Sequence, residues 1–184
     1  MFCPAHNDEG VTSKMSKNRG ALLAAAVIAV VLIGANVLPS AAQQPPAPIA
    51  TELLTGRAVF TDNVDLKIKN KLDGKATEVV NVKDPSRTVV ARITLQPGAQ
   101  FPWHTHPGPV IVNVVKGELV YVGSDDCLER EYPAGTAFID AGHGHVHTAF
   151  NRTDDETVLV ATFFEAPAQG PLLLPAQAPT DCNI

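Results

Sequence analysis

Two short histidine-rich runs constrain this chain more than any other part of its sequence. Five of its six histidines lie in residues 98–110 and 143–151. In an extended strand, side chains at positions i and i+2 point to the same face, with Cα atoms about 6.6 Å apart. His104 and His106 are therefore predicted to direct both imidazoles toward one point. Because neutral imidazole is the commonest metal-binding side chain, this pair is a candidate metal site.

A third ligand has to come from elsewhere in the fold, and His147 in the second run is the candidate. His145 lies two residues earlier and would share its face in a regular strand. Two roles are open for His145, as a fourth metal ligand or as a residue that supports the ligands. His143 is expected to lie exposed in a loop. The rival interpretation of all these histidines is a hydrogen-bonded cluster without metal.

The spacing of the first run resembles the first motif of the cupin family. The match consists of Gly98, five residues, the His104-x-His106 pair and a further glycine at Gly117. Cupins usually carry a glutamate after the histidine pair, and Val110 occupies that position here. The resemblance therefore implies the fold, while the change to Val110 removes one expected metal ligand.

The second run resembles the second cupin motif, with Gly144, two residues, His147, three residues and Asn151. Gly142 stands where the family has a proline. The resemblance covers about residues 88–166, and it implies a single jelly-roll β-barrel that holds a metal ion in its interior.

The pattern of apolar residues independently indicates an all-β fold. In residues 88–95, Val89, Ala91, Ile93 and Leu95 alternate with more polar positions, as expected for a half-buried strand. No strong amphipathic helix is apparent. Short strands separated by turn signals favour a sandwich or barrel, and the expected segments are 88–95, 110–115, 119–122, 136–139, 146–150 and 157–164.

Residues 53–83 carry little functional information. Their lysines and acidic residues are predicted to form a solvated edge strand, where lysines oppose aggregation. The Asp-Gly pair within Leu72–Lys75 predicts a hairpin turn. Among later charges, Glu118, Glu129 and Glu131 are interpreted as surface residues in or beside turns.

Residues 1–42 are predicted to be a secretory signal peptide. Three basic residues precede position 20, an apolar run covers residues 21–38, and Ser40-Ala41-Ala42 provides a cleavage site. The alternative is an uncleaved membrane anchor, because the run is near the lower length limit for crossing a bilayer. Cleavage is favoured, so the protein is expected to be exported to the periplasm or secreted, and to contact a membrane only if the segment is retained.

The remaining chain is predicted to form a linker and one domain. Residues 43–50 are rich in Pro, Ala and Gln, and residues 51–184 have the size of a single domain with a Pro-rich C-terminal tail. Without residues 1–42 the chain has 11 Lys+Arg and 17 Asp+Glu, a net charge of −6. This balance argues against a nucleic-acid partner, which would require a basic surface.

Two cysteines remain after signal cleavage, Cys127 and Cys182. In an oxidising compartment such a pair usually forms a disulfide, which would tie the tail (residues 166–184) to the barrel. The alternative is a reactive or metal-binding thiolate at Cys127.

These observations leave two classes of function. The first is a metal-dependent enzyme acting on a small molecule, and the resemblance implies an oxygenase or another oxidoreductase. The second is a non-catalytic binding or sensing module that uses the same barrel cavity. Fe, Mn, Zn, Ni and Cu all accept imidazole ligands, so the divalent metal is not identified. No separate general base, nucleophile or nucleotide-binding loop is apparent, and a homodimer is left open.

Overall fold

The computed structural model describes residues 48–82 and 85–184, and this part of the chain consists of strands and loops without a helix. Accordingly, none of its segments is an apolar helix long enough to cross a membrane. In chain order the strands are β1 (Ile49–Leu53), β2 (Ala58–Val59), β3 (Leu66–Asn70), β4 (Glu78–Val82), β5 (Arg87–Leu95), β6 (His104–Thr105), β7 (Val110–Lys116), β8 (Glu118–Gly123), β9 (Glu129–Pro133), β10 (Ala137–Asp140), β11 (His147–Phe150), β12 (Thr157–Phe163) and β13 (Leu174–Pro175).

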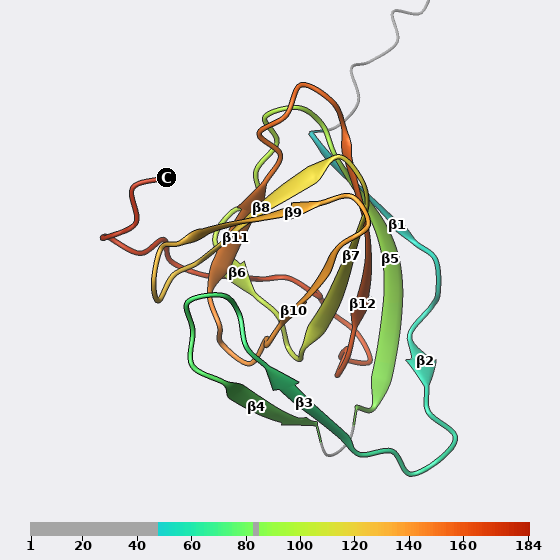
Figure 1. Cartoon of the computed structure of the whole chain (residues 1–184). Helices are drawn as coiled ribbons and strands as arrows, with labels where there is room; N and C mark the ends of the chain where they lie inside the picture. Colours follow the sequence, from blue (N-terminus) through green and yellow to red (C-terminus); the bar gives the residue numbers. More distant parts are fainter. Residues whose placement is uncertain (1–47, 83–84) are drawn as a thin grey trace, which may run out of the picture. The chain divides into compact units, whose positions relative to one another are not determined.

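These strands form two antiparallel sheets and a separate hairpin (Figure 1). The first sheet has the order β1-β5-β12-β7-β10, with β2 also paired to β5, and the second has the order β13-β6-β11-β8-β9. Strands β3 and β4 pair only with each other among the described strands. Sheet neighbours that are distant in sequence are typical of a jelly roll, so the predicted all-β jelly-roll fold is confirmed.

Strand β5 shows how the sequence fixes the inner face of the first sheet. Its residues Val89, Ala91, Ile93 and Leu95 are at most 8% exposed, as the alternation predicted. The strand pairs with β1 along one edge and with β12 along the other. Because the side-chain period is two, this register places the whole apolar set against the opposite sheet.

The main core lies between the inner faces of the two sheets. Leu119 and Tyr121 from β8 and Ala149 from β11 pack with the apolar residues of the first sheet. The other side of the second sheet carries a smaller cluster, in which Trp103 packs against Val120, Val122 and Phe150. Strand β8 is therefore buried on both faces, which makes it a rigid support for the residues that point into the barrel.

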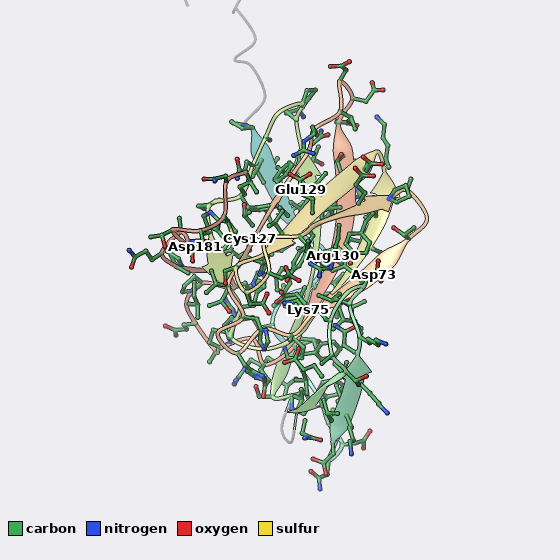
Figure 2. All side chains as sticks on the ribbon, turned by 60° about the vertical axis from the view of Figure 1, so that its left-hand side comes forward. Asp73, Lys75, Cys127, Glu129, Arg130 and Asp181 are labelled. Atoms are coloured by element: carbon green, nitrogen blue, oxygen red, sulfur yellow. A yellow bond between two sulfur atoms is a disulfide. The ribbon has the colours of Figure 1, made fainter. Side chains whose placement is uncertain are left out.

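The predicted hairpin turn in residues 53–83 is confirmed between β3 and β4. Lys75 N–H donates to the carbonyl of Leu72 at 3.0 Å, which closes the turn. The interpretation of these charges as solvated is wrong for Lys75. Its ammonium group contacts both Asp125 and Asp126. Arg130 also joins the hairpin to the barrel, donating to the Asp73 carbonyl at 2.8 Å (Figure 2).

Two strands differ from the sequence-based expectations. Glu129 and Glu131 belong to β9 rather than to turns, and their exposed side chains alternate with the buried Arg130. This strand was not predicted from the sequence, because its buried residue is an arginine and the prediction relied on apolar residues. Strand β1 begins at Ile49, inside the segment 43–50 that was predicted as a linker. The predicted signal peptide lies outside the described residues.

The predicted disulfide is present between Cys127 and Cys182, whose Cα atoms are 5.2 Å apart. Cys127 lies in the loop between β8 and β9, and Figure 2 labels it together with Asp181, the residue before Cys182. The bond ties the C-terminal segment to the barrel and excludes the alternative of a free thiolate at Cys127.

We predict that replacing both cysteines by serine lowers the free energy of unfolding by up to roughly 4 kcal/mol, because the bond closes a loop of 55 residues. Urea denaturation of the double variant and of the unchanged protein measures the difference. A stability equal to that of the unchanged protein would show that the bond does not constrain the unfolded chain.

Candidate metal centre

The pairing of β6 with β11 brings the two histidine runs together. His104 in β6 lies directly opposite His147 in β11. His106 follows one residue after the end of β6. All three side chains are buried, at 3%, 7% and 5% exposure for His104, His106 and His147. The sequence-based prediction that these three histidines converge is therefore confirmed geometrically.

The three imidazoles are close enough to share one ion. One nitrogen from each ring lies within 4.8 Å of a nitrogen from each of the others. The ring centroids of His104 and His147 are 4.2 Å apart, and those of His104 and His106 are 4.9 Å apart. Such a group of three donor atoms can hold a single metal ion.

Each of these histidines has its Nδ1 atom engaged by an oxygen. The acceptors are the Pro102 carbonyl for His104 and the Leu172 carbonyl for His106, both at 2.7 Å, and the His145 carbonyl for His147 at 3.5 Å. Asp140 Oδ2 also lies 3.1 Å from His147 Nδ1, as an ion-pair contact. A carbonyl can only accept, so Nδ1 carries the proton in His104 and His106, and the carboxylate favours the same tautomer in His147. The Nε2 lone pairs are thereby left free, which is the arrangement that metal-binding histidines require.

Asp140 is a functional residue that the sequence analysis missed. It lies at the end of β10, is 2% exposed, and contacts both His147 and the Tyr121 hydroxyl, which donates to Oδ2 at 2.9 Å. Its other oxygen accepts the backbone N–H of Gly142 at 2.9 Å. The available signal was an acid placed two residues after Phe138 on an inward-facing strand position, where an apolar residue is expected.

Burial keeps the imidazoles of His104 and His147 neutral. Desolvation, reinforced by the neighbouring His147, lowers the pKa of His104 to about 3. Desolvation also lowers the pKa of His147, although the nearby Asp140 opposes the shift. Burial and the Asp140 carboxylate raise the pKa of Tyr121, so its hydroxyl stays protonated and donates to Asp140. Neutral histidines present lone pairs to a cation, whereas protonated ones would repel it.

His145 does not join the cluster, which corrects the prediction that it shares a face with His147. Strand β11 begins only at His147, and residues 142–144 all have positive φ angles, so the preceding chain is a tight loop. The His145 side chain is exposed, and its Nε2 lies 2.7 Å from Glu78 Oε1 on β4. His143 is exposed in the same loop, as predicted, and contacts Glu165.

Gly142 holds this loop against the first histidine run. A Cβ atom at Gly142 would lie 2.1 Å from the carbonyl oxygen of Gly108, so only glycine fits. Its φ of 63° is also in the left-handed region. This close contact accounts for glycine at the position where cupins have proline, since proline cannot adopt a positive φ.

Asn151, the last residue of the second motif, has a structural role. It is 1% exposed, and its amide nitrogen donates to the carbonyls of Leu95 and Asp155 at 3.2 and 2.7 Å. Its oxygen accepts the backbone N–H of Thr153. These contacts fix the turn between β11 and β12 and leave the asparagine without a contact to the histidines in the described structure.

A cavity of about 280 Å³ opens beside the three histidines. Val110 lines it at the position of the cupin glutamate, so no carboxylate reaches the cluster from there. Of the residues flanking the first run, Phe101 lines the cavity, whereas Trp103 packs outside the second sheet and Gln100 bonds to Thr148. The remaining lining is almost wholly apolar and comprises Ala91, Ile93, Val112, Leu119, Phe138, Ala149, Leu159, Ala161, Phe163, Pro171, Leu172 and Leu173, with Thr51, Tyr121 and Asp140.

Residues 91–163 match the cupin domain family. They include both histidine runs and the strands from β6 to β12. This part of the chain is therefore similar to a type-2 cupin domain, in agreement with the motif resemblance.

Several solved structures are similar to part of this chain. An oxalate oxidase in complex with the substrate analogue glycolate is 31% identical, over 43% of this chain and 42% of that one, with a TM-score of 0.37. The polyketide cyclase RemF from Streptomyces resistomycificus is 19% identical over 64% and 72%, with a TM-score of 0.42. The cupin domain of a transcriptional regulator from Enterobacter cloacae is 16% identical over 66% and 99%, with a TM-score of 0.43.

The chain thus spans less than half the length of that oxalate oxidase. Comparison with curated proteins gives no match.

We predict that the metal-free protein loses stability as the pH falls from about 6.5 toward about 3. The folded pKa of His104 is about 3 against 6.5 when unfolded, so in this window the unfolded chain binds a proton that the folded chain excludes. Each such histidine lowers the free energy of unfolding by about 1.4 kcal/mol per pH unit. Urea midpoints at pH 7, 5.5 and 4.5 measure the slope.

Carboxylate titration contributes to this slope in every variant, so the comparison is with His104→Asn. That variant is expected to lose less stability on acidification, whereas the exposed-site control His143→Ala keeps the original slope. Identical slopes in His104→Asn and the unchanged protein would contradict the assignment.

Proposed function

We propose that this protein is a metal-binding cupin whose divalent transition metal is held by His104, His106 and His147. The observation that carries the proposal is the tautomer that the three rings have in common. Each Nδ1 proton is committed to an oxygen, and each Nε2 is free to donate its lone pair. A histidine cluster that served only packing would not need all three tautomers fixed in the same sense.

The donor set fits a divalent cation with open coordination positions. Three imidazoles are neutral ligands, and Val110 supplies none, so the charge of the ion is left for another group to balance. Asp140 contributes one negative charge indirectly, because its carboxylate contacts His147 Nδ1 at 3.1 Å. Imidazole suits Fe, Mn, Zn, Ni and Cu, and the ligand type alone does not choose among them.

The cavity is the proposed place for a small-molecule substrate. Its volume of about 280 Å³ lies at the lower end of the range of about 300–1,000 Å³ for ligand sites. Its described lining contains no lysine or arginine, so the ion itself would be the main attraction for an anionic donor atom. The apolar walls exclude water around the bound molecule, which strengthens every electrostatic interaction inside.

For the reaction class we propose an oxygenase or another oxidoreductase, as the resemblance to three-histidine cupins implies. A bound divalent metal would supply Lewis-acid or redox chemistry at this position. The chain's own residues orient the metal ligands and the substrate and exclude water. Asp140 and the Pro102 carbonyl hold the ring orientations, Phe101 and the apolar walls position the substrate, and Tyr121 keeps a proton on its hydroxyl.

A non-catalytic binding or sensing module is the second candidate, and one observation favours it. Among the described residues lining the cavity, Asp140 is the only carboxylate, and both its oxygens already accept hydrogen bonds. A free general base is therefore missing from the lining. Turnover of a bound ligand by the metal-loaded protein supports the enzyme, whereas binding without turnover supports the module.

We also propose that the protein is exported and that residues 1–42 are removed as a signal peptide. The Cys127–Cys182 disulfide supports this proposal, because such bonds form and persist in oxidising compartments. N-terminal sequencing of the protein recovered from the periplasm or medium is expected to begin near Gln43. A full-length chain retained in the membrane would instead support the anchor.

Metal content tests the ligand assignment. We expect about one metal ion per chain in the unchanged protein and none in His106→Ala or His147→Ala, because only three histidine donors are available. His143→Ala is the matched control, since this histidine is exposed and contacts Glu165 outside the cluster, and it should retain its metal. The measurement is plasma mass spectrometry after reconstitution and dialysis of each folded variant.

If the unchanged protein retains none of Fe, Mn, Zn, Ni or Cu after reconstitution, the metal proposal fails. The three histidines would then be a hydrogen-bonded cluster in a ligand-binding cavity, and the binding module would be the better description.

The Asp140 contact yields a separate prediction. In Asp140→Asn the carboxylate charge beside His147 Nδ1 is lost, and an amide N–H must face the Gly142 N–H or the Tyr121 hydroxyl, both of which donate. The His147 ring is then less firmly oriented, and we expect metal binding to weaken about 10- to 100-fold. Competition titration with a chelator measures the dissociation constant.

Tyr121→Phe is the control for this prediction, because it removes the hydroxyl and leaves the carboxylate of Asp140 facing His147. We expect its metal affinity to change less than that of Asp140→Asn. Equal affinities in Asp140→Asn and the unchanged protein would show that the carboxylate does not support the ligand.

A further inference from the structure

Residues 167–182, which we call the C-terminal strap, follow β12 and lie outside the part of the chain that matches the cupin domain. Pro171, Leu172 and Leu173 of the strap line the cavity beside the three histidines. Leu172 also packs against the main core. The strap therefore supplies part of the cavity wall, a role that the proline-rich composition of this segment does not indicate.

Three attachments hold the strap on the barrel. At its start, Arg57 donates to the carbonyls of Pro167 and Gly170 at 2.6 and 2.5 Å. In the middle, β13 pairs with β6, with Pro175 opposite His104. At its end, Cys182 is bonded to Cys127. A segment fixed at both ends and in the middle has little freedom to leave the cavity.

The strap also contacts a metal-site histidine directly. The carbonyl of Leu172 accepts the Nδ1 proton of His106 at 2.7 Å, although the two residues are 66 positions apart. The Nδ1 atoms of the other two rings face groups in the part of the chain that matches the cupin domain, the Pro102 carbonyl for His104, and the His145 carbonyl and Asp140 for His147. Among the three rings, only that of His106 has its Nδ1 acceptor in the strap.

We propose that the C-terminal strap is a working part of the metal site, with the Leu172 carbonyl as the positioning group for His106. Arg57 and the Cys127–Cys182 bond maintain that carbonyl in place. The inference rests on the proposed metal-binding function for its effect on affinity, while the orientation of His106 can be examined without metal. Losing the acceptor frees the ring to rotate and to exchange tautomers, so its Nε2 is no longer presented reliably.

The test releases both anchors together in the full-length chain, with Cys127→Ser, Cys182→Ser and Arg57→Ala combined. Nitrogen-15 spectra of the metal-free protein report the tautomer of each imidazole. We expect His106 to change from a fixed Nδ1–H form to an exchanging mixture, whereas His104 and His147 keep theirs as internal controls. In chelator competition, the dissociation constant for metal is expected to rise about 10- to 100-fold.

A matched control separates this effect from a general loss of stability. Val82→Ala removes buried volume from the small cluster beneath the β3–β4 hairpin, away from the strap, and destabilises the fold without touching His106. We expect its His106 tautomer and metal affinity to match those of the unchanged protein at a temperature where both are folded.

An unchanged His106 tautomer in the released variant would overturn the proposal, whatever the metal does. A changed tautomer with unchanged metal affinity would also overturn it, because the carbonyl would then have no effect on the ligand. If the unchanged protein binds no metal, the proposed function fails by itself, and the tautomer measurement still decides whether the strap orients His106.

Discussion

The site depends on hydrogen bonds that fix the tautomers of three buried imidazoles. An unpaired Nδ1 proton inside an apolar barrel would cost about 1–3 kcal/mol, and the ring would turn to satisfy it. The carbonyls of Pro102, Leu172 and His145 accept these protons and remove that cost, with Asp140 Oδ2 3.1 Å from His147 Nδ1, and the Nε2 atoms are left unshared. The burial that lowers the pKa of His104 and His147 also makes their lone pairs available to a cation, since protons do not compete for them near neutral pH.

The groups that face the three Nδ1 atoms come from very different places in the sequence. Pro102 lies in the loop that leads into β6, Asp140 ends β10, His145 precedes β11, and Leu172 belongs to the segment after β12. The jelly-roll topology brings them together because β6 lies between β11 and β13 in the second sheet. The strand pairing that closes the barrel is therefore also what orients the ligands, and changes that loosen one sheet edge are transmitted to the site.

Local patterns predicted an all-β fold and the common face of His104 and His106, while the resemblance to the two cupin motifs supplied the jelly roll and the place of His147. The alternation in residues 88–95 and the His-x-His pair are short-range patterns that the backbone geometry converts directly into faces. Asp140 and Leu172 were missed because their roles arise from long-range contacts. Asp140 resembles any polar strand end in the sequence, and Leu172 acts through a backbone carbonyl that every residue possesses.

His145 shows the opposite error, because its prediction assumed a strand where the chain turns. Three successive positive φ angles at residues 142–144 reverse the chain just before β11, and two of these positions are glycines. Glycines before a histidine were an available warning that strand periodicity does not apply there.

The replacement of the cupin glutamate by Val110 changes the electrostatics of the site more than its geometry. With Val110 in the wall, the described negative charge beside the histidines is that of Asp140, which lines the cavity next to His147. A divalent ion held by the three histidines would thus present roughly one unbalanced positive charge to the cavity. The walls offer no lysine or arginine to a second negative group, so a dianion would leave one charge buried and unpaired. Charge balance and apolar walls together favour a small ligand with one anionic donor at the ion and an apolar body along Phe101 and Val110.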